Sequence, residues 1–151
     1  MYARILVPID GSETSRQGLR EALALAGELK STLRLLHVTS DFPVMLEMAN
    51  AVDFGKYREG LHQYGRDLME ESRRMAERAG VAAEVELRDI KTGRVADVIV
   101  DEAATAKCDL IVIGTHGRRG FNRLVVGSDA EAVVRASPVP VLLVRAPEMK
   151  A

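Results

Sequence analysis

The residues best suited to chemistry lie in one glycine-rich stretch that runs from Gly114 to Ser128. The apolar run 109–113 precedes it and is typical of a strand buried on both faces of a parallel sheet. After it, Ser128 can cap a helix. Glycines followed by a helix N-terminus present free backbone N–H groups and the positive end of a helix dipole, which together bind anions. The stretch therefore predicts a phosphate site.

The elements that must position this stretch alternate along the chain. Apolar runs bounded by turn residues predict strands at Arg4–Pro8, Thr32–Val38, Ala82–Arg88, Asp109–Ile113 and Val141–Arg145. Helical spacing and capping residues predict helices after Asp10 as far as Leu29, at about 56–79 and 94–106, and from Ser128 to near Ala136. The stripe from Tyr57 to Ala79 on the second helix indicates core or dimer contacts. The least periodic segment, 40–55, is interpreted as a connection.

Strands joined by helical crossovers predict an α/β fold. We expect a single domain over 1–151 with a doubly wound, five-stranded parallel sheet, strand order 3-2-1-4-5 and helices on both faces. In such a sheet ligands bind where the winding direction reverses, between the first and fourth strands. Asp10 follows the first strand and Gly114 ends the fourth, so both should flank one crevice.

Composition narrows the class of protein. The chain has 151 residues with 47% apolar content, enough for one buried core. Its 21 Lys and Arg nearly balance 22 Asp and Glu, which argues against nucleic acid as a partner. No apolar run is long enough to span a membrane. The single cysteine, Cys108, precedes a buried strand, and a reduced thiol at the core edge fits a cytoplasmic location.

The spacing of the glycines separates this stretch from other phosphate motifs. Neither a P-loop nor a Gly-x-Gly-x-x-Gly turn is present. The pattern Gly114-x-x-Gly117, nine residues and then Gly127-Ser128 resembles the nucleotide-binding signature of the universal stress protein family. The early Pro8-Ile-Asp-Gly-Ser, the 109–117 run and the closing Pro138-Val-Pro-Val-Leu-Leu-Val extend the resemblance over essentially the whole chain.

This resemblance implies a domain that binds ATP, or the related ADP or AMP, and forms a homodimer. Asp10 would face the ribose and phosphates or a Mg or Mn ion held with them, and Val38 would meet adenine through its backbone. Gly114, Gly127 and Ser128 would surround the ribose and phosphates. The full set of expected nucleotide-binding residues is Pro8, Asp10, Val38, Gly114, Thr115, His116, Gly117, Arg118, Gly127, Ser128 and Asp129.

Several of these residues have simpler interpretations. Gly114 and Gly117 could only allow a tight turn, and Asp10 could only begin a helix. Arg118 could steer a polyphosphate or be a solvated surface residue, and His116 could touch phosphate or orient the loop. His37 and His62, inside a strand and on a charged helix, do not suggest metal binding.

Asp129 departs from the family pattern, which more often has a small or β-branched apolar residue after the serine. An acidic side chain in the first turn of a helix favours the helix dipole but repels phosphate if it points inward. The direction of the Asp129 side chain therefore bears on phosphate affinity.

The leading hypothesis is an ATP-binding regulatory module in which nucleotide binding changes dimer or partner contacts. No nucleophile, base and orienting acid combine in the sequence, so enzymatic activity is not expected. A slow nucleotide hydrolase or phosphotransferase using Asp10 and a metal is the alternative, and a non-nucleotide interaction domain is a third. The apolar segment 139–144 should form a sheet edge that pairs with a second copy.

Overall fold

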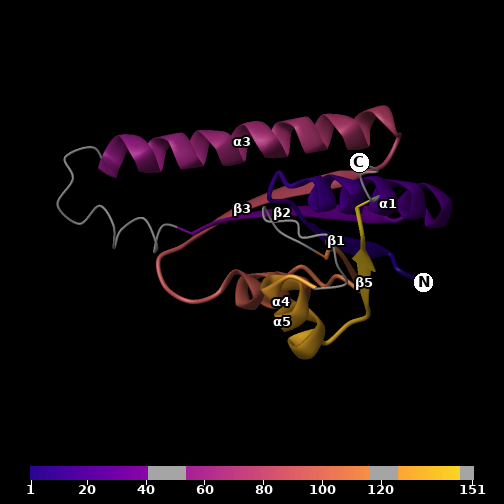
Figure 1. The fold of residues 1–151 in the computed structure, drawn as a ribbon. Coiled ribbons are helices and arrows are strands. Elements are labelled where there is room, and N and C mark those ends of the chain that lie inside the picture. The colour runs from indigo at the N-terminus through magenta and orange to yellow at the C-terminus, as the bar shows by residue number, and fades with distance from the viewer. Residues whose placement is uncertain (41–53, 116–125, 147–151) are drawn as a thin grey trace, which may run out of the picture.

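The computed structural model describes residues 1–40, 54–115 and 126–146 (Figure 1). Its sheet has five strands in the order β3-β2-β1-β4-β5, and every neighbouring pair is parallel, as predicted. The strands are β1 (Arg4–Pro8), β2 (Thr32–Ser40), β3 (Ala83–Ile90), β4 (Leu110–Gly114) and β5 (Val141–Val144). The predicted connection at 40–55 lies almost wholly outside the described residues.

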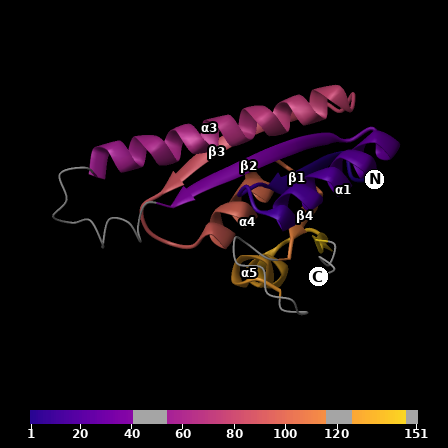
Figure 2. The same cartoon turned by 45° about the horizontal axis from the view of Figure 1, so that its top comes forward.

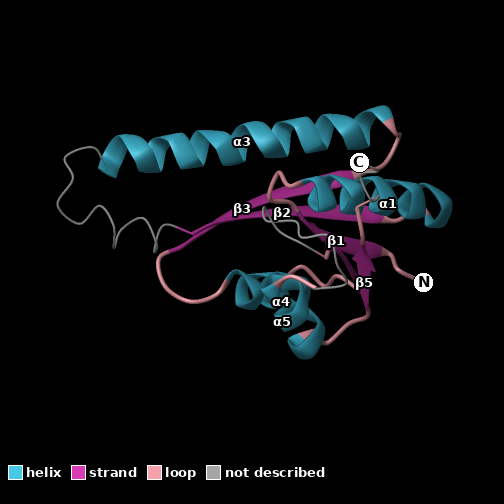
Figure 3. Cartoon of the chain, viewed as in Figure 1, coloured by secondary structure: helices cyan, strands magenta, loops and turns pink. Residues whose placement is uncertain are grey.

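Helices cover both faces of the sheet, as the crossovers require. Helices α1 and α3 lie on one face, and α4 and α5 lie on the other (Figures 1 and 2). Figure 3 shows how helices and strands alternate along the chain. The helices are α1 (Glu13–Leu29), α3 (Phe54–Arg78), α4 (Val95–Thr105) and α5 (Ser128–Ala136).

The central strand β1 divides the interior into two cores. Ile5, Leu6 and Val7 are all fully buried, because side chains alternate between the two covered faces. Ile5 and Val7 join the core under α1 and α3, whereas Leu6 joins the core under α4 and α5. This strand can therefore be apolar without interruption, and polar residues begin where it ends, at the carboxyl edge of the sheet.

Cys108 lies in the second core, where it is buried. Burial raises the pKa of its thiol, so the thiolate is disfavoured. The expectation of an unreactive core-edge cysteine is consistent with this position. Within the described residues, no helix is both long and apolar enough to cross a membrane.

The apolar stripe expected on α3 is shifted along the helix surface. Its buried positions are Gly65, Leu68, Met69, Ser72 and Ala76. Tyr57 and Tyr64 are instead exposed, at 45% and 42%. Leu68 and Met75 of the predicted stripe do contact the core, whereas the two tyrosines lie at its border, where large amphipathic rings can keep their hydroxyl ends near water.

Candidate functional site

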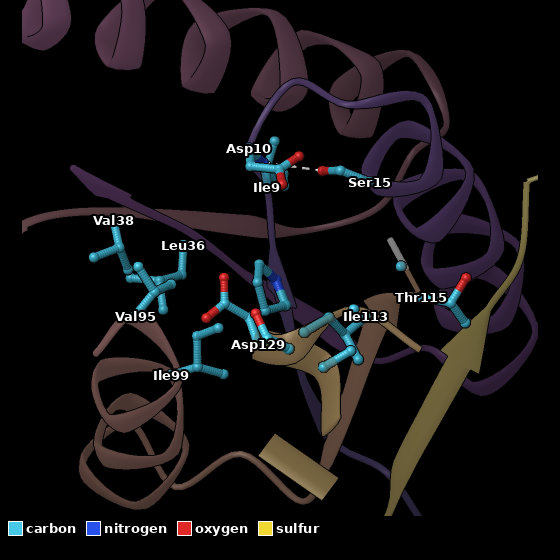
Figure 4. A pocket seen from close by; sticks show the side chains of 15 residues that line it. Ile9, Asp10, Ser15, Leu36, Val38, Val95, Ile99, Ile113, Thr115 and Asp129 are labelled. Atoms are coloured by element: carbon cyan, nitrogen blue, oxygen red, sulfur yellow. Dashed lines mark hydrogen bonds between the residues drawn. The ribbon is translucent and has the colours of Figure 1, made fainter. Parts of the chain in front are cut away.

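A cavity of about 380 Å³ opens at the carboxyl edge of the sheet, between the ends of β1 and β4. This is the position at which the winding direction of the sheet reverses. Figure 4 shows the side chains around it, which come from the ends of β1, β2 and β4 and the starts of α1, α4 and α5. The lining residues are Pro8, Ile9, Asp10, Ser15, Leu36, Val38, Val95, Ile99, Ile113, Gly114, Thr115, Gly127, Ser128, Asp129 and Ala130.

Two hydrogen bonds hold Asp10 in the loop between β1 and α1. The Asp10 backbone N–H donates to Ser15 Oγ at 3.0 Å, and Asp10 Oδ1 accepts from the Ser12 N–H at 2.8 Å. Ser12 is also the N-cap of α1, because its Oγ accepts from the Ser15 N–H at 3.2 Å; of the two residues that could cap this helix, Ser12 and Thr14, the structure has Ser12. Asp10 is therefore fixed at the cavity with one carboxylate oxygen engaged by the loop itself.

Helix α3 supports this loop from outside. Gly11 has a φ of 85°, which side-chain-bearing residues rarely adopt, and the Tyr64 hydroxyl occupies the space that a Cβ would need. Beneath the loop, His37 Nδ1 lies 2.7 Å from the Ile9 carbonyl oxygen. His37 is buried, so it is a hydrogen-bonded core histidine.

Gly114 has a packing role that its place in a phosphate motif would not reveal. A Cβ built on this residue would lie 2.6 Å from both the carbonyl carbon and the oxygen of Thr14, in the first turn of α1. Only glycine lets β4 and α1 approach this closely. This contact, rather than a tight turn alone, is the structural reason for glycine at this position.

Thr115 connects the end of β4 to both neighbouring elements. Its N–H donates to the Val144 carbonyl at 2.9 Å, and its own carbonyl accepts from the Gly127 N–H. The side chain is buried, and within the described part of the chain its hydroxyl has no hydrogen-bond partner. A buried hydroxyl without a partner is costly unless something else satisfies it, such as a ligand or water.

The start of α5 differs from the prediction. Gly127, not Ser128, is the N-cap, and no side chain among the described residues caps the helix with a hydrogen bond. Ser128 is the first helical residue, because a glycine with φ −58° and extended ψ already supplies the backbone turn. Ser128 and Asp129 are both exposed at the cavity. Their polar groups are thus open to the space in front of the helix.

Asp129 points into the cavity in Figure 4, toward the side formed by Leu36, Val95 and Ile99. The surrounding walls remove part of the hydration of its carboxyl and raise its pKa. The nearby Asp10 charge raises it further, and Arg94 acts in the opposite direction. This answers the question left open by the sequence: the side chain is directed inward.

The side of the cavity formed by β2 and α4 is apolar, and most of it was missed by the sequence analysis. Leu36, Val95 and Ile99 contribute it, and Ile113 of β4 is a further apolar lining residue that was missed. Their positions in the sequence could have identified them as cavity residues, because Leu36 and Ile113 lie near the carboxyl ends of central strands. The i and i+4 spacing of Val95 and Ile99 places both on one face at the start of α4.

A buried ion-pair network fixes α4 in this position. Glu102, which is 4% exposed, lies 3.0 Å from both Arg34 and Arg88. Arg34 belongs to β2 and Arg88 to β3, so one carboxylate joins the helix to two strands. Ile99 lies one turn before Glu102 and is thereby held against the cavity.

Val38 adds backbone hydrogen-bonding groups to the side of the cavity formed by β2. The β1–β2 ladder ends at Pro8 and Leu36, and the Leu36 carbonyl accepts from the Ile9 N–H at 2.8 Å. Alternate residues of a strand direct their backbone groups to the same side. The N–H and C=O of Val38 therefore face the cavity side beyond the end of β1.

The cavity brings together eight of the residues expected from the sequence, namely Pro8, Asp10, Val38, Gly114, Thr115, Gly127, Ser128 and Asp129. The other three, His116, Gly117 and Arg118, lie outside the described residues. Among the described lining residues, two are carboxylates, three carry hydroxyls and none is basic. In Figure 4 the apolar side chains of Leu36, Val38, Val95 and Ile99 lie together on one side of the cavity, and Asp10, Ser15 and Thr115 lie away from them.

Comparison with known proteins places this geometry in a family. The sequence matches the family model described as "Universal stress protein family" over residues 1–145. The chain belongs to the universal stress protein family. Universal stress protein MJ0531 of Methanocaldococcus jannaschii is 32% identical over 148 residues, which cover 98% of this chain and 85% of that protein.

Solved structures agree with the fold. The structure of hypothetical protein MJ0577 superposes with a TM-score of 0.85 at 26% identity and covers 99% of each chain. A universal stress protein family member from Arabidopsis thaliana, At3g01520, was solved with AMP bound. It superposes with a TM-score of 0.70 at 20% identity, covering 96% of this chain and 92% of the plant protein.

Proposed function

We propose that this protein binds ATP or a related adenine nucleotide in the cavity between β1 and β4, and that binding regulates its contacts with a second copy or a partner. The observation that carries the proposal is the division of the cavity into an apolar side and a side of backbone and hydroxyl donors. A volume of about 380 Å³ falls within the usual range of small-molecule sites, roughly 300–1,000 Å³.

The two sides suit the two ends of a nucleotide. Leu36, Val95 and Ile99 offer apolar surface to a planar base, and the backbone of Val38 can pair with its polar edge. Ser128 offers its N–H in the first turn of α5, where the helix dipole favours phosphate, whereas the Gly127 N–H is already donated to the Thr115 carbonyl. The Thr115 hydroxyl, which has no hydrogen-bond partner among the described residues, supplies a further donor. AMP in the Arabidopsis relative is consistent with such a ligand.

A Mg or Mn ion could accompany the phosphates. Asp10 has one carboxylate oxygen engaged by Ser12, which leaves the other for a cation. The described residues contain no group of three or more His, Cys, Asp or Glu able to hold a metal. Magnesium commonly uses one or two carboxylates together with substrate phosphates and water. We therefore propose that any metal binds with the nucleotide and not before it.

Calorimetric titration with ATP and Mg²⁺ tests the binding proposal. The wild-type protein should show saturable binding, and Gly127→Glu should abolish it, because a carboxylate would be placed at the start of α5. Gly27→Glu makes the same change on α1 where a Cβ meets no atom within 4 Å, and should bind like the wild type. Absence of ATP binding by the folded wild-type protein would reject the proposal.

We further propose a homodimer formed through the 139–144 segment, in a cytoplasmic protein. Strand β5 pairs only with β4 in the described sheet, and its Leu142 and Leu143 are 41% and 36% exposed. Leu142→Arg should give a monomeric mass in solution scattering. Leu29→Arg changes a leucine of equal exposure on α1 and should leave the dimer intact. A monomeric wild-type protein at micromolar concentration would contradict the dimer.

A further inference from the structure

Asp129 occupies an unexpected place for an acid in a cleft that would take an anionic ligand. Its carboxylate points toward the apolar side formed by Leu36, Val95 and Ile99 (Figure 4). Its backbone, in contrast, belongs to the first turn of α5, on the side that offers N–H donors. One residue thus spans both sides of the cavity, with its backbone at one and its charge at the other.

The inward direction of the side chain disfavours its charged form. The walls of the cavity remove part of the hydration of the carboxyl, and the charge of Asp10 lies nearby; both raise the pKa of Asp129, whereas Arg94 opposes them. No hydrogen bond within the described residues engages this carboxylate to offset that cost.

The chemistry of a nucleotide limits what an inward carboxylate can meet. An ionised carboxylate is purely a hydrogen-bond acceptor, and phosphate oxygens are acceptors that also carry negative charge. The donors of an adenine nucleotide are the exocyclic amino group of the base and the ribose hydroxyls, all on the nucleoside. The apolar side of the cavity, toward which Asp129 points, is the side that suits the nucleoside.

We propose that Asp129 is a specificity-determining residue that accepts a hydrogen bond from a donor on the nucleoside, either the exocyclic amine or a ribose hydroxyl. This inference rests on the proposed nucleotide binding. A site built around an unpaired acceptor disfavours ligands that lack the matching donor, because the carboxylate then loses hydration without compensation. The carboxylate therefore selects the nucleoside, while the α5 backbone beside it receives the phosphates.

The test compares ATP with three analogues that each lack one donor: purine riboside triphosphate, which has hydrogen in place of the exocyclic amine, 2′-deoxy-ATP and 3′-deoxy-ATP. Each is titrated by calorimetry into the wild type, Asp129→Ala and Asp129→Asn. Glu131→Ala is the matched control, since it removes another carboxylate from the first turn of α5, one that pairs with Arg135 at 2.9 Å and does not line the cavity. Asp129→Asn keeps a carbonyl acceptor of the same size if Asp129→Ala folds poorly.

The wild type should bind at least one analogue about 10- to 100-fold more weakly than ATP, the range expected for one hydrogen bond to a charged group. The affinities of Asp129→Ala for that analogue and for ATP should differ by less than about threefold. Asp129→Asn should keep part of the preference for ATP, and Glu131→Ala should keep all of it. The identity of the weak analogue distinguishes the amine from the hydroxyls.

Three results would overturn the inference while leaving nucleotide binding in place. The wild type could bind all four nucleotides equally, Asp129→Ala could retain the wild-type preference, or it could bind every nucleotide more tightly by one common factor. The last result would mean that Asp129 only repels phosphate. Failure of the wild type to bind ATP at all would instead reject the proposed function itself.

Discussion

On the wall of the cavity formed by β1 and α1, side-chain contacts fix the lining residues, whereas the Ser128 and Asp129 side chains at the start of α5 make no hydrogen bonds within the described residues. On the first wall Asp10 is bonded to Ser12 and Ser15, and α3 closes over Gly11. On the second wall α5 begins without a side-chain cap, and both Ser128 and Asp129 are exposed. Both walls face the same cavity.

This difference implies that residues of the first wall are needed for stability and residues of the second wall for ligand binding. Residues of the first wall are held in place by the fold. A ligand that binds them therefore loses little free energy to the ordering of side chains. Residues of the second wall have few partners within the described protein, and their side chains are available to a ligand. Substitutions should therefore reduce stability on the first wall and change ligand affinity on the second.

The largest effect on stability should come from Gly114→Ala, where the first wall meets β4. The new Cβ would lie 2.6 Å from the backbone carbon and oxygen of Thr14, and neither atom can move without shifting α1. Overpacking of this kind costs roughly 1–3 kcal/mol, and we expect the upper end. Urea denaturation measures it. Gly27→Ala, in open space on α1, should instead stabilise by about 0.5–1 kcal/mol. Equal stability of Gly114→Ala and the wild type would contradict the packing role.

Gly11→Ala should have the next largest effect and can be partly rescued. The left-handed φ of 85° costs roughly 1–2 kcal/mol for a residue with a Cβ, and the Tyr64 hydroxyl occupies the space that the Cβ needs. Adding Tyr64→Phe removes the nearest atom but leaves the backbone strain. A double-mutant cycle in urea should show the double variant to be more stable than the sum of the single changes. Strict additivity would mean that α3 does not constrain the loop.

Much of this architecture could be predicted because it depends on patterns along the sequence. The strand order followed from alternating strands and helices and the handedness of crossovers, and it placed Asp10 and Gly114 at one edge. Glycine spacing drew attention to the right segments. Apolar residues such as Val95 and Ile99 were missed because a core helix and a cavity wall share the same apolar periodicity.

Other features depend on contacts between distant segments and leave no local signal. The approach of Gly114 to Thr14 and of Gly11 to Tyr64 exists only after the helices pack. The cap of α5 was assigned to Ser128 because serine is a strong N-cap former, yet the backbone turn falls on Gly127. The direction of Asp129 likewise depends on the position of the whole helix, which the sequence alone left open.

A matched pair of serines compares the two walls directly. Ser12→Ala removes the N-cap bond of α1 and should cost about 1 kcal/mol in urea denaturation. Ser128→Ala removes no cap bond from α5 and should change stability by less than about 0.5 kcal/mol. In ATP titrations the order should reverse, because Ser128 lines the cavity and Ser12 does not. If both variants lost stability equally, the two walls would not differ as described.

The smallest effect on stability should come from Asp129→Asn, and it should depend on pH. The folded protein raises the Asp129 pKa above its ordinary 3.8, first by removing hydration and then through Asp10, while Arg94 opposes the change. A raised pKa favours the protonated folded form, so the contribution of Asp129 to stability is full below pH 3.8 and is lost as pH rises through the folded pKa.

Replacing the acid should therefore stabilise the protein at pH 7, by less than about 0.5 kcal/mol for so exposed a group. Urea midpoints of both proteins should converge as pH falls toward 4. A wild-type advantage at pH 7 would mean that the α5 dipole outweighs the lost hydration, and the second wall would then contribute to stability after all.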